Sequence, residues 1–240
     1  MQQQRLPSLL DPPIAFAHRG ARAHAPENTI EAFGLALRLG ATGLESDVWI
    51  TSDGIPVLDH DGVIKRRGRR TLISDVGRDA LPQHIPTVAE FVGALPGDHH
   101  VSLDVKDPAA FQPLIDVVRS TCPELETRLW LCHHDWRLVA TWRAHTSAKL
   151  VDSTRLARIK EGPERRAADL ADAGIDCINM HHTDWSGGLV TLFHRFDLCT
   201  LGWDMQQDHV LRAGFRMGLD GVFSDHVDRM MDAFGAEIGG

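Results

Sequence analysis

The chain has 240 residues, and 43% of them are hydrophobic, which is enough for a sizeable core in one domain. Its formal net charge of -8 argues against general nucleic-acid binding, which needs a basic surface. The opening segment MQQQRLPSLLDPP has neither the charged nor the apolar region of a signal peptide, and no apolar run is long enough to cross a membrane. We therefore expect a cytoplasmic protein with no transmembrane segment and no nucleic-acid partner.

The four cysteines show neither CxxC nor zinc-type spacing, and three of them fall in apolar, strand-like runs. They are Cys122, Cys132, Cys177 and Cys199. This pattern favours buried, reduced thiols over disulfides or a metal centre.

The first predicted strand is Ile14–Ala17, a short apolar run that ends in the polar tripeptide His18 to Gly20. Asn28 and Glu31 lie three residues apart, a spacing typical of a helix N-cap. Three apolar residues then repeat at helical spacing before Gly40: Ile30, Phe33 and Leu37. A helix is therefore expected directly after the first strand.

The second predicted strand is Gly43–Thr51, whose side chains alternate between two faces. Glu45, Asp47 and Trp49 share one face, and the other face is mostly apolar. Two carboxylates at positions i and i+2 of one face repel each other unless a cation lies between them. A hard divalent ion with oxygen ligands, Mg²⁺ or Ca²⁺, is the natural occupant.

Two histidines follow strands that are close together in chain order. Asp53-Gly54 is a strong hairpin signal and returns the chain along Ile55–Leu58 toward His60. His18 follows the first strand, and both histidines can exchange a proton near neutral pH. Arg19 adds a forked cationic donor suited to phosphate. Together with the carboxylates, these groups indicate cleavage of a phosphate ester.

Residues 61–86, after the hairpin, are the least regular segment of the sequence. Five basic residues crowd there: Lys65, Arg66, Arg67, Arg69 and Arg70. They are either a cationic rim that attracts a phosphodiester or an anionic lipid surface, or the charges of a solvated loop. Both interpretations stay open.

The remaining chain alternates helices and strands. A helix at Val88–Leu95 precedes a third strand, His100–Lys106, in which Asp104 and Lys106 share a face. Later strands are expected at Leu129–His133, Leu150–Asp152, Cys177–Met180, Leu198–Trp203 and Val222–Phe223, with helices at Trp136–His145, Pro163–Ala173, Leu189–Phe196, His209–Met217 and Val227–Phe234. Eight strand–helix units favour an α/β fold of the TIM (β/α)8 barrel type, with residues 1–240 as one domain.

Two histidine pairs end predicted strands, namely His133-His134 and His181-His182. Paired histidines suggest zinc or iron. Neighbouring strand residues point to opposite sides, however, so at most one histidine of each pair should face a common site. A role in substrate lining or structure is therefore favoured over metal binding. Ser224-Asp225, after the last strand, is interpreted as a helix-capping pair.

Six motifs occur in order between Ala17 and Asp61: HRG, PENT, AF, GA, LE-x-DV and T-x-DG-x-PV-x-x-HD. This set resembles the glycerophosphodiester phosphodiesterase family, and weaker traces continue to Asp225. The resemblance implies a TIM barrel and a metal-dependent phosphodiesterase that hydrolyses small glycerophosphodiesters to an alcohol and glycerol 3-phosphate. In the family the glycerol 2-hydroxyl is thought to attack first, giving a cyclic phosphate that water then opens.

The resemblance also implies a role for each matching residue. His18 and His60 would be the general acid/base pair, in an order that stays open, and Arg19 and Lys106 would bind the phosphate. One metal ion would be held by Glu45, Asp47 and Asp104. Trp203 would form a wall of the pocket for the alcohol. Asp104 stands where the family has the longer Glu, so an added water or a shifted metal is expected. The family carries an insertion after its second strand that covers the active site, and the resemblance places residues 61–86 there. This insertion is shorter than usual, which should leave the mouth of the site more open, and Arg66 matches an arginine of the family's HD-x-x-L-x-R pattern.

Two other functions stay open at this point. One is an enzyme for larger diesters such as lysophospholipids, with phospholipase-D-like cleavage. The other is a barrel that binds phosphorylated ligands without turning them over.

Overall fold

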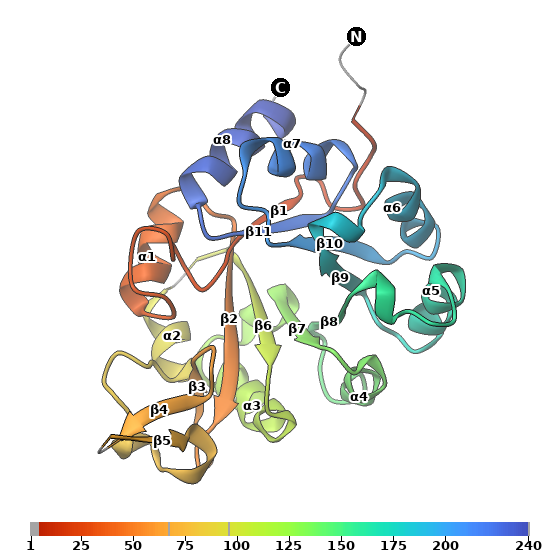
Figure 1. The fold of residues 1–240 in the computed structure, drawn as a ribbon. Helices are drawn as coiled ribbons and strands as arrows, with labels where there is room; N and C mark the ends of the chain where they lie inside the picture. The colour runs from red at the N-terminus through yellow and green to blue at the C-terminus, as the bar shows by residue number, and fades with distance from the viewer. Residues whose placement is uncertain (1–4, 67, 96, 240) are drawn as a thin grey trace.

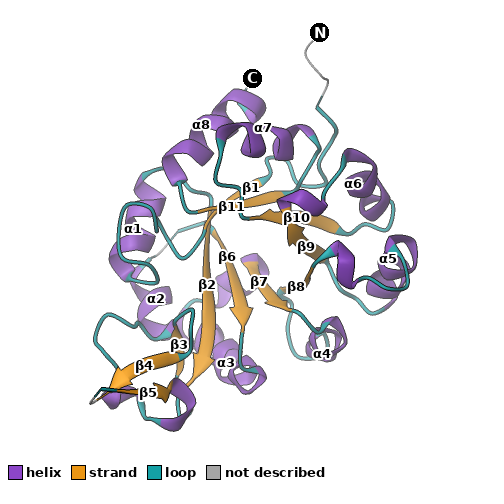
Figure 2. Cartoon of the chain, in the orientation of Figure 1, coloured by secondary structure: helices purple, strands orange, loops and turns teal. Residues whose placement is uncertain are grey.

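The computed structural model describes residues 5–66, 68–95 and 97–239, and there the chain forms a closed barrel of parallel strands with helices outside it (Figures 1 and 2). The strand order is β1-β11-β10-β9-β8-β7-β6-β2, and β1 pairs with β2 to close the ring. The barrel strands are β1 (Ile14–Ala17), β2 (Gly43–Ile50), β6 (His100–Val105), β7 (Leu129–His133), β8 (Lys149–Thr154), β9 (Cys177–His181), β10 (Cys199–Trp203) and β11 (Gly221–Ser224). The predicted TIM barrel is confirmed.

A helix follows each barrel strand before the next one begins. The helices are α1 (Ile30–Arg38), α2 (Val88–Ala94), α3 (Phe111–Thr121), α4 (Trp136–Trp142), α5 (Pro163–Asp172), α6 (Gly187–His194), α7 (Asp208–Arg216) and α8 (Val227–Ile238). Short 3₁₀ turns join several of them, including η5 (Leu156–Arg158). Across the described ranges, none of the helices has the length and hydrophobicity that a membrane crossing requires.

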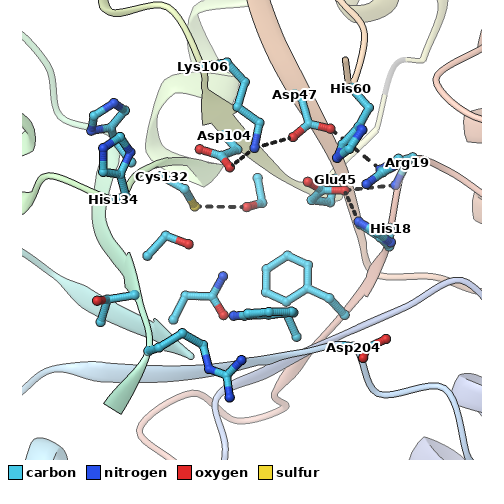
Figure 3. A pocket seen from close by; sticks show the side chains of 18 of the residues that line it. His18, Arg19, Glu45, Asp47, His60, Asp104, Lys106, Cys132, His134 and Asp204 are labelled. Atoms are coloured by element: carbon cyan, nitrogen blue, oxygen red, sulfur yellow. Dashed lines mark hydrogen bonds and ion pairs between the residues drawn. The ribbon is translucent and has the colours of Figure 1, made fainter. Parts of the chain in front are cut away.

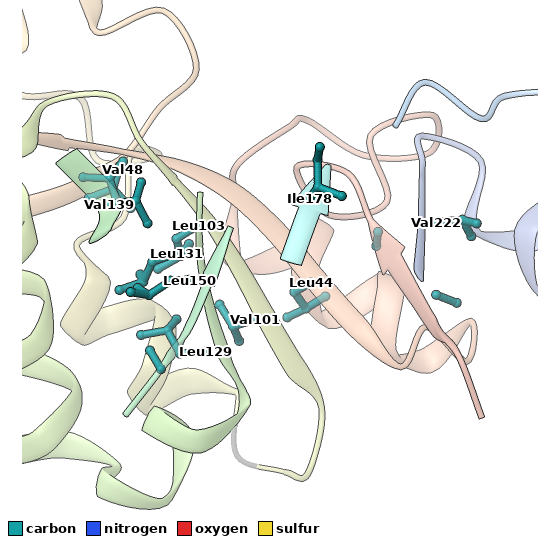
Figure 4. Close-up of a cluster of buried hydrophobic side chains, with 14 of the residues drawn as sticks. Leu44, Val48, Val101, Leu103, Leu129, Leu131, Val139, Leu150, Ile178 and Val222 are labelled. Carbon is teal, nitrogen blue, oxygen red and sulfur yellow. The ribbon is translucent and has the colours of Figure 1, made fainter. Parts of the chain in front are cut away.

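Two hydrophobic layers hold the barrel together. The outer layer joins the outward faces of the strands to the helices, through buried side chains such as Leu44, Leu103 and Leu131 (Figure 4). Inside the barrel, the Phe16 and Phe223 rings stack with centroids 4.6 Å apart. Because Phe223 also lines the cavity described below, this aromatic layer forms part of the floor of the site.

The cysteine prediction agrees with the structure. All four cysteines are free, and three are buried in β7, β9 and β10, where they pack as small apolar side chains.

The start of α1 differs from the sequence-based expectation. Its N-cap is Thr29, whose hydroxyl accepts a hydrogen bond from the Ala32 N–H at 3.1 Å, so the assignment of Asn28 was wrong. Asn28 has a left-handed backbone, φ 55°, and its Oδ1 accepts from the Ser46 hydroxyl at 2.8 Å. The asparagine therefore ties the loop after β1 to β2 instead of capping the helix.

The insertion is more ordered than the sequence suggested. After β3 (Pro56–Leu58), which runs antiparallel to β2, come the paired strands β4 (Val63–Arg66) and β5 (Arg69–Leu72). They lie beyond the carboxyl end of β2 (Figure 1). A separate cluster of apolar side chains supports them: Val57, Ile64, Ile73, Val76, Leu81 and Ile85. The local sequence of residues 61–86 did not predict this hairpin, because its apolar side chains are buried by residues from the whole segment and not by near neighbours in the chain.

The basic residues of the insertion lie around the β4–β5 hairpin. Lys65, Arg69 and Arg70 are exposed, whereas the Arg66 side chain and Arg67 lie outside the described residues. None of the described residues 61–86 lines the cavity considered next. The cationic rim and the solvated loop therefore both remain hypotheses.

Candidate active site

A cavity of about 670 Å³ opens at the carboxyl ends of the barrel strands, the end at which TIM barrels place their sites (Figure 3). All eight residues that the sequence singled out for a function line it: His18, Arg19, Glu45, Asp47, His60, Asp104, Lys106 and Trp203. They come from β2, β6 and β10 and from the residues that follow β1, β3 and β6, so barrel closure brings together positions as far apart as 18 and 203.

Glu45 and Asp47 both point into the cavity from β2, as their alternation predicted. The backbone N–H of Arg19 donates to Glu45 Oε2 at 2.9 Å, and Lys106 Nζ lies 3.0 Å from Asp47 Oδ1. The turn that presents Arg19 depends on Gly20, whose φ is +79° and where a Cβ would lie 2.8 Å from the Ala32 backbone. The HRG sequence thus packs closely on α1 while directing an amide at the carboxylate.

The two β2 carboxylates are held in an environment that disfavours their charge. Burial raises the pKa of Glu45 to about 7, against the lowering effect of His18, and burial with the nearby Asp104 raises the pKa of Asp47 despite Lys106. Asp47 Oδ2 is buried and accepts no hydrogen bond from the described residues. A divalent cation between these oxygens would satisfy that atom and favour both ionised forms. The residues present therefore fit a hard metal ion.

Asp104 stands apart from this pair. Its carboxylate is bound by Lys106, which also reaches Asp47. Within the described ranges, the two groups of possible ligands whose atoms all lie within 4.8 Å include neither Glu45 nor Asp47 nor Asp104. They are His24, His226 and Asp228, and His181, His182 and Asp204. Asp104 would have to leave the lysine, or act through a water, to complete a site at Glu45 and Asp47. This agrees with the expectation from the shorter side chain, which predicted an added water or a shifted metal at Asp104.

His18 is positioned by a residue from the opposite end of the chain. Its Nδ1 lies 2.6 Å from Asp225 Oδ1, while its Nε2 lies 3.8 Å from Glu45 Oε2. Burial lowers the pKa of His18, but the Glu45 charge and the Asp225 hydrogen bond outweigh it, so the pKa is raised above the usual value. The α8 N-terminus has no side-chain cap, so the capping role predicted for Asp225 was wrong.

His60 enters from the loop after β3 and is more exposed. Its Nδ1 lies 2.8 Å from Asp61 Oδ1, an interaction between chain neighbours. Arg19 is mostly buried, and its NH1 lies 3.2 Å from both oxygens of Glu27. Its Nε donates no hydrogen bond within the described residues but lies 3.7 Å from Asp47 Oδ2, close enough for an ion pair. An arginine held in this way directs donor groups at the cavity without needing to be ordered on binding.

Each of the two histidine pairs lies at the end of a strand, where side chains no longer alternate between the two faces of the sheet. His133 and His134 both line the cavity, with ring centroids 4.2 Å apart, so the expectation that at most one would face in was wrong. The strand β7 ends at His133, and the next residue is therefore free to turn inward. The rings of His181 and His182 also lie together, 4.4 Å apart, and His181 contacts the Trp203 ring. Neither histidine lines the cavity.

With this geometry established, comparison with known proteins decides the family. The model of the glycerophosphoryl diester phosphodiesterase family matches residues 18–229. This chain belongs to that family. The match begins at His18, directly after β1, and extends beyond Asp225, so it covers every residue singled out for the site and the barrel strands β2 and β6 to β11.

Several relatives agree with the assignment. A probable glycerophosphodiester phosphodiesterase 2 of Mycobacterium tuberculosis is 28% identical over 245 residues, covering 91% of this chain and 89% of that protein. The human glycerophosphodiester phosphodiesterase 1 is 56% identical over 52 residues, but that match spans 22% of this chain and only 16% of the human protein.

Solved structures of the family share the fold. One from Silicibacter pomeroyi, described as a putative glycerophosphoryl diester phosphodiesterase, has a TM-score of 0.82 at 21% identity, covering 96% of this chain and 95% of that one. A phosphodiesterase of Oleispira antarctica, in complex with the product sn-glycerol-3-phosphate, has a TM-score of 0.81 at 21% identity, covering 92% and 96%.

Several other residues of this chain line the cavity, although the sequence analysis predicted no function for them. Ser102, Cys132, Ser153, Thr154, Arg155, Arg158, Asn179, Asp204 and Phe223 are such residues. They lie on several different strands and loops, and no local motif connects them. Position at the carboxyl end of a predicted strand was the signal that could have identified many of them.

Proposed function

We propose that this protein is a phosphoric diester hydrolase that cleaves glycerophosphodiesters to an alcohol and glycerol 3-phosphate. The observation that carries the proposal is the convergence of a buried carboxylate pair, two cations and two histidines on one cavity. Family membership supports the substrate class, as does the Oleispira relative crystallised with the product sn-glycerol-3-phosphate.

In this proposal Glu45 and Asp47, with Asp104, hold one divalent ion, Mg²⁺ or Ca²⁺. The ion would polarise a phosphoryl oxygen and offset the charge that builds up on phosphate. Arg19 and Lys106 bind the remaining phosphate oxygens, since both present donors to the cavity. Asp104 and Asp47 raise the pKa of Lys106 well above its usual range, although burial lowers it, so the lysine stays cationic.

The proton transfers fall to His18 and His60. In this role the Nδ1–H of His18 donates a hydrogen bond to Asp225 Oδ1, 2.6 Å away. His18 Nε2 is then free to take or give a proton on the cavity side. One histidine takes the proton of the attacking hydroxyl as the new P–O bond forms, and the other protonates the leaving alcohol oxygen as the old bond breaks. If the glycerol 2-hydroxyl attacks, water then opens the cyclic phosphate by the same two groups.

The cavity lining favours this function over the two alternatives. Most of the residues that line it are charged or polar, which suits a small charged diester better than the acyl chain of a lysophospholipid. A non-catalytic binding protein would have no need for the His18–Asp225 pair, which sets both the orientation and the protonation of one imidazole.

The test is the release of glycerol 3-phosphate from purified protein given glycerophosphoglycerol, glycerophosphocholine or a lysophospholipid. We expect turnover of at least one glycerophosphodiester, loss of that turnover in EDTA, and recovery when Mg²⁺ or Ca²⁺ is returned. The Glu45→Ala variant should require more metal for half-maximal rate. Full activity in excess EDTA would contradict the metal site, and cleavage confined to the lysophospholipid would support the alternative enzyme.

A further inference from the structure

The cavity has a second charged wall, across from the carboxylates and histidines. Asp204 marks it in Figure 3, on the far side of the cavity from Asp47 and Lys106. Two arginines also line this wall, Arg155 just after β8 and Arg158 at the end of η5. The cavity lining here thus has two permanent cations against one carboxylate.

Arg155 is fixed in place before any ligand arrives. Its Nε and NH2 lie 2.6 Å and 3.2 Å from the two carboxylate oxygens of Asp184, a bidentate pair that holds the guanidinium plane. Its Cζ also lies over the Trp203 ring, 5.6 Å from the centroid. These contacts involve one edge and the face of the guanidinium, so the NH1 donors remain for a ligand in the cavity.

Arg158 and Asn179 complete the surroundings of this wall. Arg158 is exposed and forms no ion pair with an acid in the part of the chain that the structure describes. Asn179 is only 7% exposed and lines the cavity, yet its Oδ1 has no hydrogen-bond partner among the described residues. A buried, unpaired acceptor is costly unless a ligand hydroxyl or water reaches it. Asn179 Oδ1 is therefore an acceptor that a hydroxyl of a bound alcohol can use.

Asp204 offsets one of the two cations of this wall, which leaves one in excess among the side chains that line it. Its carboxylate is bound by His181 Nε2 at 3.2 Å and by Gln206 Nε2 at 3.3 Å. Asp184, the partner of Arg155, lies behind the wall and does not line the cavity.

We propose that this wall is the subsite for the leaving alcohol, and that it selects hydroxylated alcohols carrying an additional negative charge, with Arg155 as the specificity-determining residue. The inference rests on the proposed function and names its substrate class. Arg155 and Arg158 bind the extra anionic group, and Asn179 accepts a hydrogen bond from a hydroxyl. The subsite disfavours choline, because Arg155 already occupies the Trp203 face on which a quaternary ammonium would stack.

Three substrates that differ in the charge of the leaving alcohol test this directly. They are bis(glycerophosphoryl)glycerol, whose leaving group carries a second phosphate, glycerophosphoglycerol, which releases neutral glycerol, and glycerophosphocholine, which releases a cation. For the natural protein we expect kcat/KM to fall in that order, with about tenfold or more between the first and the last. Equal values, or a preference for the choline diester, would overturn the inference while leaving the proposed function intact.

The variants separate charge recognition from folding. Arg155→Met keeps most of the side-chain bulk and should lower the ratio of kcat/KM for the anionic over the neutral substrate about 10- to 100-fold. Asp184→Asn should lower the same ratio less, because it loosens Arg155 without removing it. Arg165→Met is the control, since Arg165 pairs with Asp169 on the outer surface of α5, and the ratio should not change.

The outcomes are distinguishable. A fall of all three rates by the same factor in Arg155→Met would mean that the arginine is only structural, and would overturn the subsite. If the natural protein hydrolyses none of the three diesters, the proposed function fails and the subsite with it.

Discussion

Asp225 Oδ1 lies 2.6 Å from His18 Nδ1, although 207 positions of the chain separate the two residues. Barrel closure causes this contact, since β1 pairs in parallel with β11 and Ala17 is in register with Ser224. The residue that follows each strand end then faces the same space. The carboxylate fixes the imidazole orientation and contributes to raising its pKa.

Replacing Asp225 by Asn should reduce kcat about 10²-fold, at the lower end of what positioned proton transfer contributes, because His18 loses its anionic partner. The pKa of His18 should fall, since the Asp225 hydrogen bond and charge raise it. The limb of the pH–rate profile governed by His18 should therefore move to lower pH. The matched control is Asp228→Asn, which alters the pair of His24 Nε2 and Asp228 Oδ1, 3.0 Å apart on the surface. An unchanged pH profile in Asp225→Asn would contradict the positioning role.

The two histidines should be separately essential. His18→Ala and His60→Ala should each lower kcat by about two to four decades while the variants stay folded. The double variant should lose less than the sum of the two effects in free energy, because both groups serve one proton relay. Steady-state rates and circular dichroism on the three variants measure this. Near-normal turnover in either single variant would remove that histidine from the proposed mechanism.

Asp104 is the ligand to test by a conservative change. Asp104→Ala should raise the Mg²⁺ or Ca²⁺ concentration needed for half-maximal activity, because it removes one oxygen donor. Asp104→Glu should be tolerated, and should tighten binding if the short side chain is the weak point. Calorimetric titration of the metal-free protein gives the affinity without relying on turnover. Equal metal affinity in all three proteins would show that Asp104 is not a ligand.

A stability prediction concerns the buried Glu126, away from the site. Arg119 donates to both of its oxygens at 2.8 Å, and Thr146 Oγ1 donates at 2.7 Å. The Arg119 hydrogen bonds, helped by Thr146 and Ser147, lower the pKa of Glu126 from 4.5 to about 2. Because the folded-state pKa is depressed, this stabilisation is present above about pH 5 and is lost as the pH falls toward 2.

Glu126→Gln should therefore lower the free energy of unfolding at pH 7 by about 2 kcal/mol. The variant should also show a weaker loss of stability between pH 5 and pH 2. Urea unfolding at several pH values measures both effects. Glu164→Gln, at an exposed position at the start of α5, is the control and should change stability by at most about 0.5 kcal/mol. A pH dependence identical to that of the natural protein would contradict the assignment.

Local pattern was sufficient for most of the scaffold and for the residues nearest the chemistry. The bounds of β1 and β7 follow from short apolar runs closed by polar residues, and the two-residue period of β2 places Glu45 and Asp47 on one face. The Asp53-Gly54 turn gave the antiparallel β3. These features depend on neighbours within a few residues, which a sequence displays directly.

Tertiary structure decided the rest, for an equally physical reason. Asp225 was predicted to cap a helix because nothing in its local sequence shows that His18 lies beside it. Asn28 was predicted to cap the helix after the first strand, a role that Thr29 has instead. Arg155 acquires its direction from Asp184, 29 positions away, and from the Trp203 ring on another strand. Periodicity determines which way a side chain points from its own strand. Barrel closure determines which other side chains that side chain contacts. Closure therefore brings the separate strand ends together as one site.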